Sequence, residues 1–447
     1  MLENRETAQG SVRGDGDSDS LTERAHRAVR LVAERTATTD QVAELALTAA
    51  EQAVHPVGWY PPSLSHGQAG TALLHLYAAR AGLGDRETAF THIREAVLST
   101  RVVPLENPGI FGGTSGLALA LADCAADEPR FLPSLHRVHE QLAAQVLDTD
   151  YRAVERVLSD ADYDWIGGAA GVLAYLATVE DPSPAVREAV RRLLDYLVWL
   201  SEPAQAERTP RRWLLVPDAY PPVGDYHARY PHGYLNLGYS HGVPGVAAAL
   251  AAAVAAGHRH PGLESAVATL TSWILGHRTA DEFGPLWHDG VPVDEHGEER
   301  PRTHGHDRIA WCYGTAGVAS ALLDVARATG DSDLLTTAVT AFEAVLRRAE
   351  QAGPLSPTLC HGQAGLLMMC RAFAPWSRLA RERTPVLLDR LLDHSDEARP
   401  AVFADHEVPG NLVDDPGLLT GAAGVALAIL AALNDDRPAW FRAFFAR

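Results

Sequence analysis

The sequence predicts an all-α fold, an α/α toroid in which seven helix hairpins form a ring with seven inner and seven outer helices. The first observation is a Gly-x-x-Gly pair that opens an apolar run seven times along the chain. The second is an amphipathic segment between one run and the next, and the third is the scarcity of strand signals. The first glycines of the pairs are Gly67, Gly113, Gly168, Gly242, Gly314, Gly362 and Gly421.

The runs that follow the glycine pairs are apolar on nearly every face, as in residues 241–252 and 420–431. A helix that is apolar all round is buried on all sides, so these runs are expected to form the inner layer. Glycine lacks a Cβ, which lets the chain turn sharply into each inner helix and lets neighbouring backbones approach closely. An open solenoid is the alternative, but the small side chains of the runs favour a ring closed around an axis.

The segments between the runs carry apolar residues on one face only, as in residues 184–200 and 332–352. A helix with one wet face suits the outer layer of the ring. Ser20 and Glu23 form a capping box, which predicts where the first of these helices begins.

The chain is predicted to hold one folded domain. Residues 1–22 are polar and acidic, which is typical of a disordered tail, and residues 23–447 are expected to form a single toroid domain. Two insertions interrupt it, at about residues 201–235 and 283–307, and long loops of this kind are often functional. Because both insertions flank the fourth repeat, they are expected to cover one end of the ring.

Composition excludes several classes of protein. The formal net charge of −19 argues against nonspecific nucleic-acid binding, which requires basic surfaces. The N-terminal region lacks the apolar segment of a secretory signal, and no apolar run is long enough to cross a membrane. The four cysteines are too few for a disulfide scaffold. These features predict a cytoplasmic enzyme with reduced thiols and no integral membrane segment.

The residues just before each glycine pair meet at one end of the inner barrel in such a ring. Cys312 occupies this position in the fifth repeat, and Cys360 and His361 occupy it in the sixth. Two thiolates and one imidazole suit zinc, and three protein ligands leave a fourth position open, as catalytic zinc requires. The alternative is that both cysteines are small core residues, as we expect for Cys124 and Cys370 inside the helical runs.

His241 occupies the corresponding position of the fourth repeat, next to the predicted zinc site. An imidazole there is a candidate general acid or base, with a capping or core histidine as the alternative. Asp164 precedes the glycine pair of the third repeat by four residues. Its place beside His241 in the ring predicts a proton relay, with a surface aspartate as the alternative. His66 has the same local motif in the first repeat but no neighbouring cysteine, so we expect it to be structural.

Arg308 and Trp311 stand just before Cys312. The guanidinium could hold an oxyanion or a carboxylate, and the indole could form a wall of the zinc pocket, while ordinary packing is the alternative for each. The second insertion contains a group of histidines that could bind metal, but histidines clustered in a polar loop are more often solvated. They are His288, His296, His304 and His306.

Four stretches together resemble the lanthionine synthetase C-like family, the lantibiotic cyclases. The stretches are YDWIGGAAG (163–171), NLGYSHGVPG (236–245), RIAWCYGTAG (308–317) and LCHGQAG (359–365). The resemblance extends over about residues 23–447 and implies the same α/α toroid. It also implies that the first insertion stands where some cyclases carry a small extra lobe.

The resemblance implies roles for the residues singled out above. Cys312, Cys360 and His361 match the ligands of a Zn²⁺ ion, and His241 and Asp164 match the residues that transfer protons. Arg308 and Trp311 match pocket positions of the family, and in that setting Arg308 is a candidate to stabilise an enolate oxygen.

The activity that the resemblance implies is that of a zinc-dependent lanthipeptide cyclase. Such an enzyme adds peptide cysteine thiolates to dehydroalanine or dehydrobutyrine, which forms lanthionine or methyllanthionine rings in a precursor peptide of leader and core. The sequence carries no kinase or lyase signature, so a separate dehydratase is the expected partner. Two alternatives stay open: addition of glutathione or another free thiol to dehydrated residues, and a zinc-stabilised toroid that binds peptides without catalysis.

Overall fold

The computed structural model describes residues 20–55, 58–152, 157–203, 211–221, 224–301, 308–406 and 408–446. Residues 1–19 of the predicted tail lie outside this part of the chain, as do segments of both insertions with His304 and His306. The division into a tail (1–22) and one domain (23–447) stays a prediction, although the first helix already begins at Leu21.

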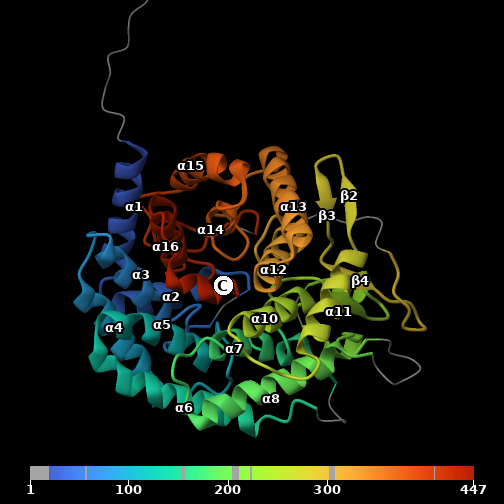
Figure 1. Cartoon of the computed structure of the whole chain (residues 1–447). Coiled ribbons are helices and arrows are strands. Elements are labelled where there is room, and N and C mark those ends of the chain that lie inside the picture. Colours follow the sequence, from blue (N-terminus) through green and yellow to red (C-terminus); the bar gives the residue numbers. More distant parts are fainter. Residues whose placement is uncertain are drawn as a thin grey trace, which may run out of the picture.

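Seven apolar helices form the inner layer, as predicted (Figure 1). In six of them the first glycine of the pair is the residue that caps the N-terminus, and in α12 the glycine is the first helical residue. Nearly every inner-helix side chain is buried. The inner helices are α3 (Gln68–Arg80), α5 (Thr114–Asp127), α7 (Ala169–Leu176), α10 (Val243–Ala255), α12 (Gly314–Thr329), α14 (Gln363–Phe373) and α16 (Ala422–Leu433).

Seven amphipathic helices surround this layer. They are α1 (Leu21–Arg35), α4 (Arg86–Ser99), α6 (Leu132–Asp148), α8 (Pro184–Ser201), α11 (Leu263–Gly276), α13 (Ser332–Gln351) and α15 (Arg378–Leu392). The capping box of Ser20 and Glu23 starts α1, as the sequence predicts. One further helix, α2 (Thr39–Gln52), packs on α3 and α4.

The ring is closed. The last inner helix, α16, packs against the first, α3, and α1 packs against α16 (Figure 1). The N-terminal helix therefore supplies the outer helix of the last repeat, which joins the two ends of the chain. The structure confirms the predicted all-α toroid and excludes an open solenoid.

The strands of the described residues lie in or next to the two insertions. Strand β1 (Tyr234–Asn236) pairs antiparallel with β4 (Gly290–Pro292), and β2 (Thr279–Asp281) pairs antiparallel with β3 (Gly284–Leu286). The β1–β4 pair links the first insertion to the second. The short helical elements are α9 (Tyr226–Arg229), η1 (Pro129–Phe131), η2 (Asp160–Asp162), η3 (Pro217–Ala219) and η4 (Ala439–Ala443).

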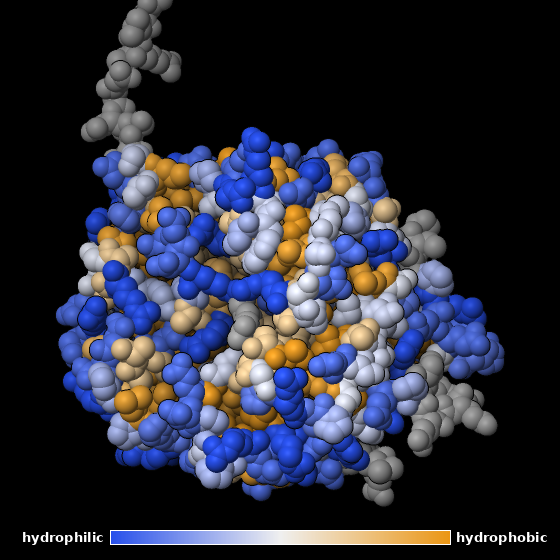
Figure 2. Space-filling view, in the orientation of Figure 1, coloured by the Kyte–Doolittle hydropathy of each residue, from blue (hydrophilic) through white to orange (hydrophobic). Residues whose placement is uncertain are grey.

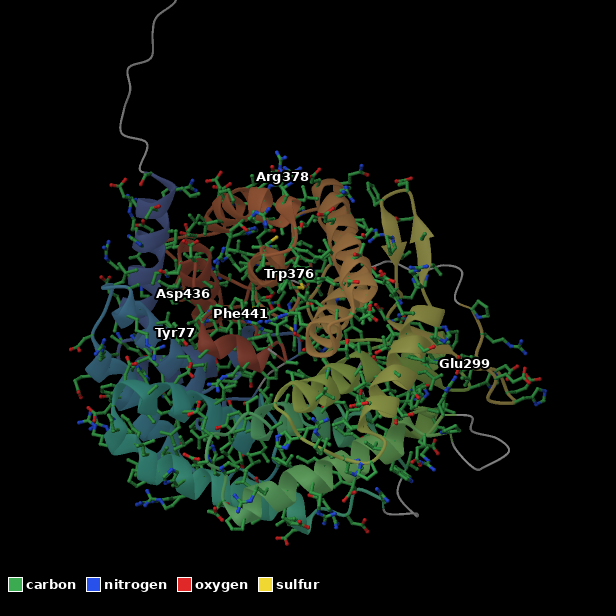
Figure 3. All side chains as sticks on the ribbon, in the orientation of Figure 1. Tyr77, Glu299, Trp376, Arg378, Asp436 and Phe441 are labelled. Carbon is green, nitrogen blue, oxygen red and sulfur yellow. The ribbon has the colours of Figure 1, made fainter. Side chains whose placement is uncertain are left out.

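The C-terminal segment fills the centre of the ring, a feature that the glycine repeats do not predict. The indole Nε1 of Trp165 donates to the carbonyl oxygen of Ala443, and that of Trp311 donates to the carbonyl oxygen of Phe444, both at 2.7 Å. Figure 3 shows Phe441 of η4 near the middle of the ring. The barrel interior is therefore a packed core, and Trp311 belongs to it.

The outside of the ring is mostly polar. On the face shown in Figure 2, hydrophilic and apolar residues are interspersed, in keeping with the net charge of −19. Within the described part of the chain, no helix is both long and apolar enough to span a membrane.

Candidate active site

Glycine is required at the turns that lead into the inner helices. A Cβ on Gly362 would lie 2.0 Å from the carbonyl oxygen of Ser356, and one on Gly242 would lie 2.4 Å from that of Asn236. Real atoms do not approach so closely, so the turns fold this tightly only without a side chain at these positions. The tight turns place Cys360, His361 and His241 directly before their helices.

Backbone hydrogen bonds join the turns of successive repeats into a belt around the ring. The bonds are 2.7 to 3.3 Å long and run from Ser65 N to Phe111 O, Phe111 N to Ile166 O, Trp165 N to Ser240 O, Ser240 N to Cys312 O, Cys360 N to Leu419 O and Leu418 N to Ser65 O. Among the described residues, no such bond joins residues 308–313 to residues 356–361. This seam of the belt lies between the two cysteines.

The two cysteine side chains meet at the seam. Cys312 is buried and Cys360 is half-buried. A hydrogen bond from the Cys360 thiol lowers the pKa of Cys312, burial opposes this, and the positive charges of Arg308, His361 and His241 lower the pKa further. The same hydrogen bond raises the pKa of Cys360. The site therefore favours a thiolate on Cys312, the form of cysteine that binds a metal.

The carboxylate of Asp405 lies next to the imidazole of His361. The imidazole Nε2 lies 3.8 Å from Oδ1 of Asp405, and Ser356 donates a hydrogen bond to the same oxygen at 2.6 Å. Burial raises the pKa of Asp405, but the hydrogen bonds from His361 and Ser356 lower it more, so the group remains ionised. Histidine ligands of zinc commonly have such a carboxylate behind the ring. Two thiols and this imidazole are donor types that zinc prefers, so the assignment of Cys312, Cys360 and His361 as zinc ligands stays a prediction.

His241 and Asp164 form a tight pair, as the repeat alignment predicts. The distance from His241 Nδ1 to Asp164 Oδ2 is 2.5 Å. Asp164 is buried, and its Oδ1 accepts hydrogen bonds from the backbone N–H groups of Gly167 and Gly168 at 2.8 Å. Burial lowers the pKa of His241, but the hydrogen bond and charge of Asp164, together with Asp160, raise it to about 9. The imidazole is therefore protonated at neutral pH and can donate a proton.

Asp160 completes a group of possible donors with this pair. The ligand atoms of Asp160, Asp164 and His241 all lie within 4.8 Å of one another. The Oδ atoms of Asp164 are already bonded to two backbone N–H groups and to His241. These existing bonds suit a proton relay better than a second metal site.

Arg308 and Trp311, the two pocket residues predicted before Cys312, lie in different environments. Arg308 is exposed, yet its charge lowers the pKa of both Cys312 and Cys360. Trp311 is fully buried against Phe444, with ring centroids 4.9 Å apart, so it packs in the barrel rather than against the predicted zinc site.

The structure also places two further cysteines and two histidines of the second insertion. Cys124 and Cys370 are buried inside α5 and α14, as expected for core cysteines. In the second insertion His288 is buried and His296 is exposed.

Several residues at the site were not predicted. Tyr313 follows Cys312, and its ring centroid lies 6.1 Å from that of His241. It occupies the position directly before the glycine, which the alignment already marked through His241 and His361. Asp405 and Asp415 stand in the long segment before α16, outside the glycine frame. Adjacency in the closed ring was the available signal for Asp415, because the seventh repeat adjoins the first.

Comparison with known proteins agrees with the fold. The Lanthionine synthetase C-like protein family model matches residues 58–445. The nisin biosynthesis protein NisC of Lactococcus lactis subsp. lactis is 26% identical over 268 residues, which cover 59% of this chain and 62% of that protein, less than two thirds of its length. A solved structure of nisin cyclase has a TM-score of 0.72 at 21% identity, covering 91% of this chain and 97% of the other. Because the family model matches most of the chain, the protein belongs to the lanthionine synthetase C-like family.

Proposed function

We propose that this protein is a zinc-dependent lanthipeptide cyclase. The observation that carries the proposal is the meeting of two cysteines and a carboxylate-backed histidine at the end of the ring that also holds the His241–Asp164 pair. The name of the nisin relative, a biosynthesis protein, supports it. The proposed substrate is a precursor peptide of leader and core in which serine or threonine has been dehydrated by a separate enzyme.

Cys312, Cys360 and His361 would hold the metal. A Zn²⁺ ion held there would lower the pKa of a thiol that coordinates it, so that the nucleophilic thiolate would form at neutral pH. The low pKa of Cys312 and the ionised Asp405 behind His361 prepare this set for a cation. The fourth position would take the cysteine of the substrate.

The protein residues then control the proton and the developing charge. The substrate sulfur forms a bond to the β-carbon of the dehydro residue, and the electron pair of the C=C bond moves toward the carbonyl, which gives an enolate. His241, held by Asp164, donates its proton to the α-carbon, and the proton that the substrate thiol loses restores the imidazolium. Arg308 stabilises the enolate oxygen. The product is a thioether, and no electrons are gained or lost overall.

The deciding experiment counts free thiols. The zinc-loaded protein is incubated with a dehydrated peptide that contains cysteine, and the product is alkylated and weighed by mass spectrometry. Ring formation itself should leave the peptide mass unchanged. After alkylation, the product should carry one alkyl group fewer for each ring formed. An added glutathione arm identifies the other thiol chemistry, because a glutathione adduct raises the mass. Thiols that persist with zinc bound and the correct peptide supplied refute the proposal.

A pair of cysteine variants tests the ligand assignment. Cys360→Ala removes a predicted ligand, so we expect loss of stoichiometric zinc and of ring formation. Cys370→Ala removes a core cysteine of α14 that lies outside the site, so zinc and activity should remain. Full zinc content in the Cys360 variant would exclude this thiol as a ligand.

A further inference from the structure

A cavity of about 270 Å³ lies beside His361. One wall is α2 with its C-cap residue Ala53, and Ala46, Ala49 and Ala50 of the helix also line the space. Val408 and Val413 and the indole of Trp59 add further apolar surface. The other end is polar and consists of His66, His361, Asp405, Asp415 and Thr420.

The polar end contains a second His–Asp pair. His66 Nδ1 lies 3.2 Å from Asp415 Oδ2, and this oxygen also accepts a hydrogen bond from the Thr420 hydroxyl at 2.7 Å. The other carboxylate oxygen, Oδ1, accepts from the backbone N–H of Gly417 at 2.7 Å. A carboxylate only accepts hydrogen bonds, so Nδ1 is the donor. His66 can therefore bond a ligand in the cavity only through Nε2.

This pair is the repeat counterpart of His241 and Asp164. In each pair the histidine stands directly before the first glycine of one repeat, and the aspartate comes from the repeat before it in the ring. The two pairs thus lie on opposite sides of the repeats that carry Cys312 and Cys360. The cavity and His66 belong to the side away from the proton relay.

The charges around the cavity select its ligand. Asp405 and Asp415 line it, and none of the described lining residues is an arginine or a lysine. Burial raises the pKa of Asp415, but the hydrogen bonds from His66 and Thr420 lower it more, so this carboxylate is ionised. Like charges repel, so a ligand that carries carboxylates, as glutathione does, is disfavoured. A neutral or cationic peptide segment with an apolar side chain fits.

The size and position of the cavity indicate which part of the substrate peptide could bind in it. Sites for whole small molecules measure roughly 300–1,000 Å³, so this space suits one or two side chains. His361, a predicted metal ligand, lines it. A residue next to a cysteine held at the metal lies about 3.8 Å further along the chain, measured between Cα atoms. The neighbour of the reacting cysteine is therefore within reach of the cavity.

We propose that this cavity is the subsite for the residue next to the reacting cysteine of the substrate peptide. Its apolar side chain packs on the alanines of α2, and His66, oriented by Asp415, hydrogen-bonds its backbone through Nε2. This inference rests on the proposed function, because it assumes that the substrate cysteine is held at the predicted metal ligands. It adds a preference for an apolar residue next to the reacting cysteine, which the metal ligands alone would not impose.

The test compares two leucine substitutions on different faces of α2. Ala49→Leu fills the cavity, whereas Thr48→Leu adds the same side chain on the exposed face. The probe is a fluorescently labelled peptide with an apolar residue next to its cysteine and with undehydrated serine, so that it binds but does not react. We expect Ala49→Leu to weaken binding about tenfold or more, with zinc content retained, while Thr48→Leu binds as the wild type does. Ala53→Leu serves as a second cavity variant if Ala49→Leu does not fold.

Two further measurements separate a substrate contact from a structural role. With the reactive peptide, Ala49→Leu and His66→Ala should raise KM and leave kcat nearly unchanged, and His66→Asn should restore part of the loss. A peptide with aspartate next to the cysteine should bind about tenfold less tightly than one with leucine.

The outcomes that overturn this inference differ from those that overturn the proposed function. Wild-type affinity in both cavity variants, or equal binding of the aspartate and leucine peptides, refutes the subsite even if rings form. A wild-type protein that binds the leucine peptide selectively but leaves thiols free in the reactive peptide refutes the cyclase proposal and retains the subsite.

Discussion

At the scale of single residues, the charge of Asp164 decides whether His241 can act as an acid. Burial lowers the pKa of His241, but the hydrogen bond and charge of Asp164, with Asp160 and Cys312, raise it from 6.5 to about 9, so the imidazole keeps its proton at neutral pH. A group that acts as an acid loses its function as the pH rises through its pKa. Ring formation should therefore fall above about pH 9 in the wild-type protein.

Replacing this carboxylate should move the pH profile. In Asp164→Asn the pKa of His241 falls, so the alkaline limb of the rate profile should shift down by roughly two units. The rate at pH 8 should then drop about tenfold, because only about a tenth of the imidazole keeps its proton there. Single-turnover rates from pH 6 to 10 provide the measurement, with zinc content as a check on folding. Asp162→Asn, which alters a turn only two residues away, should leave the limb in place. An unmoved limb in Asp164→Asn would exclude the relay.

The sequence could predict residues inside the glycine frame but not those outside it. Cys312, Cys360 and His241 share one register relative to the inner helices, so the repeat pattern alone is enough to place them at one end of the barrel. Asp405 and Asp415 come from a long irregular segment, whose path depends on tertiary contacts rather than on a local pattern. Trp311 shares the register, but its side chain turns inward to the C-terminal segment.

At the scale of elements, the glycine turns connect architecture to chemistry. A Cβ added to Gly362 would lie 2.0 Å from Ser356 O, so Gly362→Ala must displace the turn that carries Cys360 and His361. We expect a loss of roughly 2–4 kcal/mol in the free energy of unfolding together with weaker zinc binding. Urea unfolding and metal analysis measure the two effects. Gly353→Ala, where a Cβ meets nothing within 4 Å, is the matched control and should change neither.

A second element-scale feature is the anchor of the second insertion. Glu299 accepts hydrogen bonds from Arg211 at 3.0 Å and from Trp273 at 3.2 Å, and it lies 2.9 Å from His277 Nε2 (Figure 3 labels Glu299 at the edge of the ring). Burial raises the pKa of Glu299, but these partners lower it from 4.5 to about 2. The carboxylate thus joins residues on both sides of the fourth repeat to the outer helix α11.

The lowered pKa predicts how this anchor depends on pH. Its stabilisation is present above pH 4.5 and is lost as the pH falls toward 2. Glu299→Gln should therefore cost on the order of 2–3 kcal/mol at pH 7 and progressively less below pH 4. Denaturant unfolding at several pH values measures this difference. Glu295→Gln, at an exposed position of the same loop, should have no such pH-dependent effect; equal effects of the two variants would contradict the anchor.

The sequence did not predict the strands because they are short. Each is three residues long, as in Tyr234–Asn236, which is too short for an alternating pattern to stand out. The β1–β4 pairing joins segments more than fifty residues apart in the sequence, so only the fold brings them together.

At the scale of the whole molecule, closure of the ring depends on both ends of the chain. The repeat count predicted seven inner helices, and it also predicted that small apolar faces would close on an axis. It could not show that α1 completes the last repeat or that residues 439–446 fill the centre, because neither segment carries the glycine signature. Trp165 and Trp311, which bond to that C-terminal segment, stand in the predicted motifs for a structural purpose.

The belt of backbone hydrogen bonds suggests a test of whether the predicted metal would also stabilise the fold. Among the described residues, the belt has no bond between residues 308–313 and 356–361, and α12 and α14 pack more loosely than any other neighbouring pair of inner helices. The predicted ligands Cys312 and Cys360 lie on opposite sides of this seam. A metal held by both would supply the link that the backbone does not.

Removal of the metal should therefore loosen the ring at one place. After chelation we expect amide hydrogen exchange to rise at least about tenfold at the two turns of the seam and the first turns of α12 and α14. Exchange in α3 and α5, across the ring, should change little, because the belt is continuous there. In Cys360→Ala the seam should exchange rapidly with or without chelator, whereas Cys370→Ala should behave as the wild type. Uniform loss of protection around the ring would instead mean that the metal stabilises the whole fold rather than this seam.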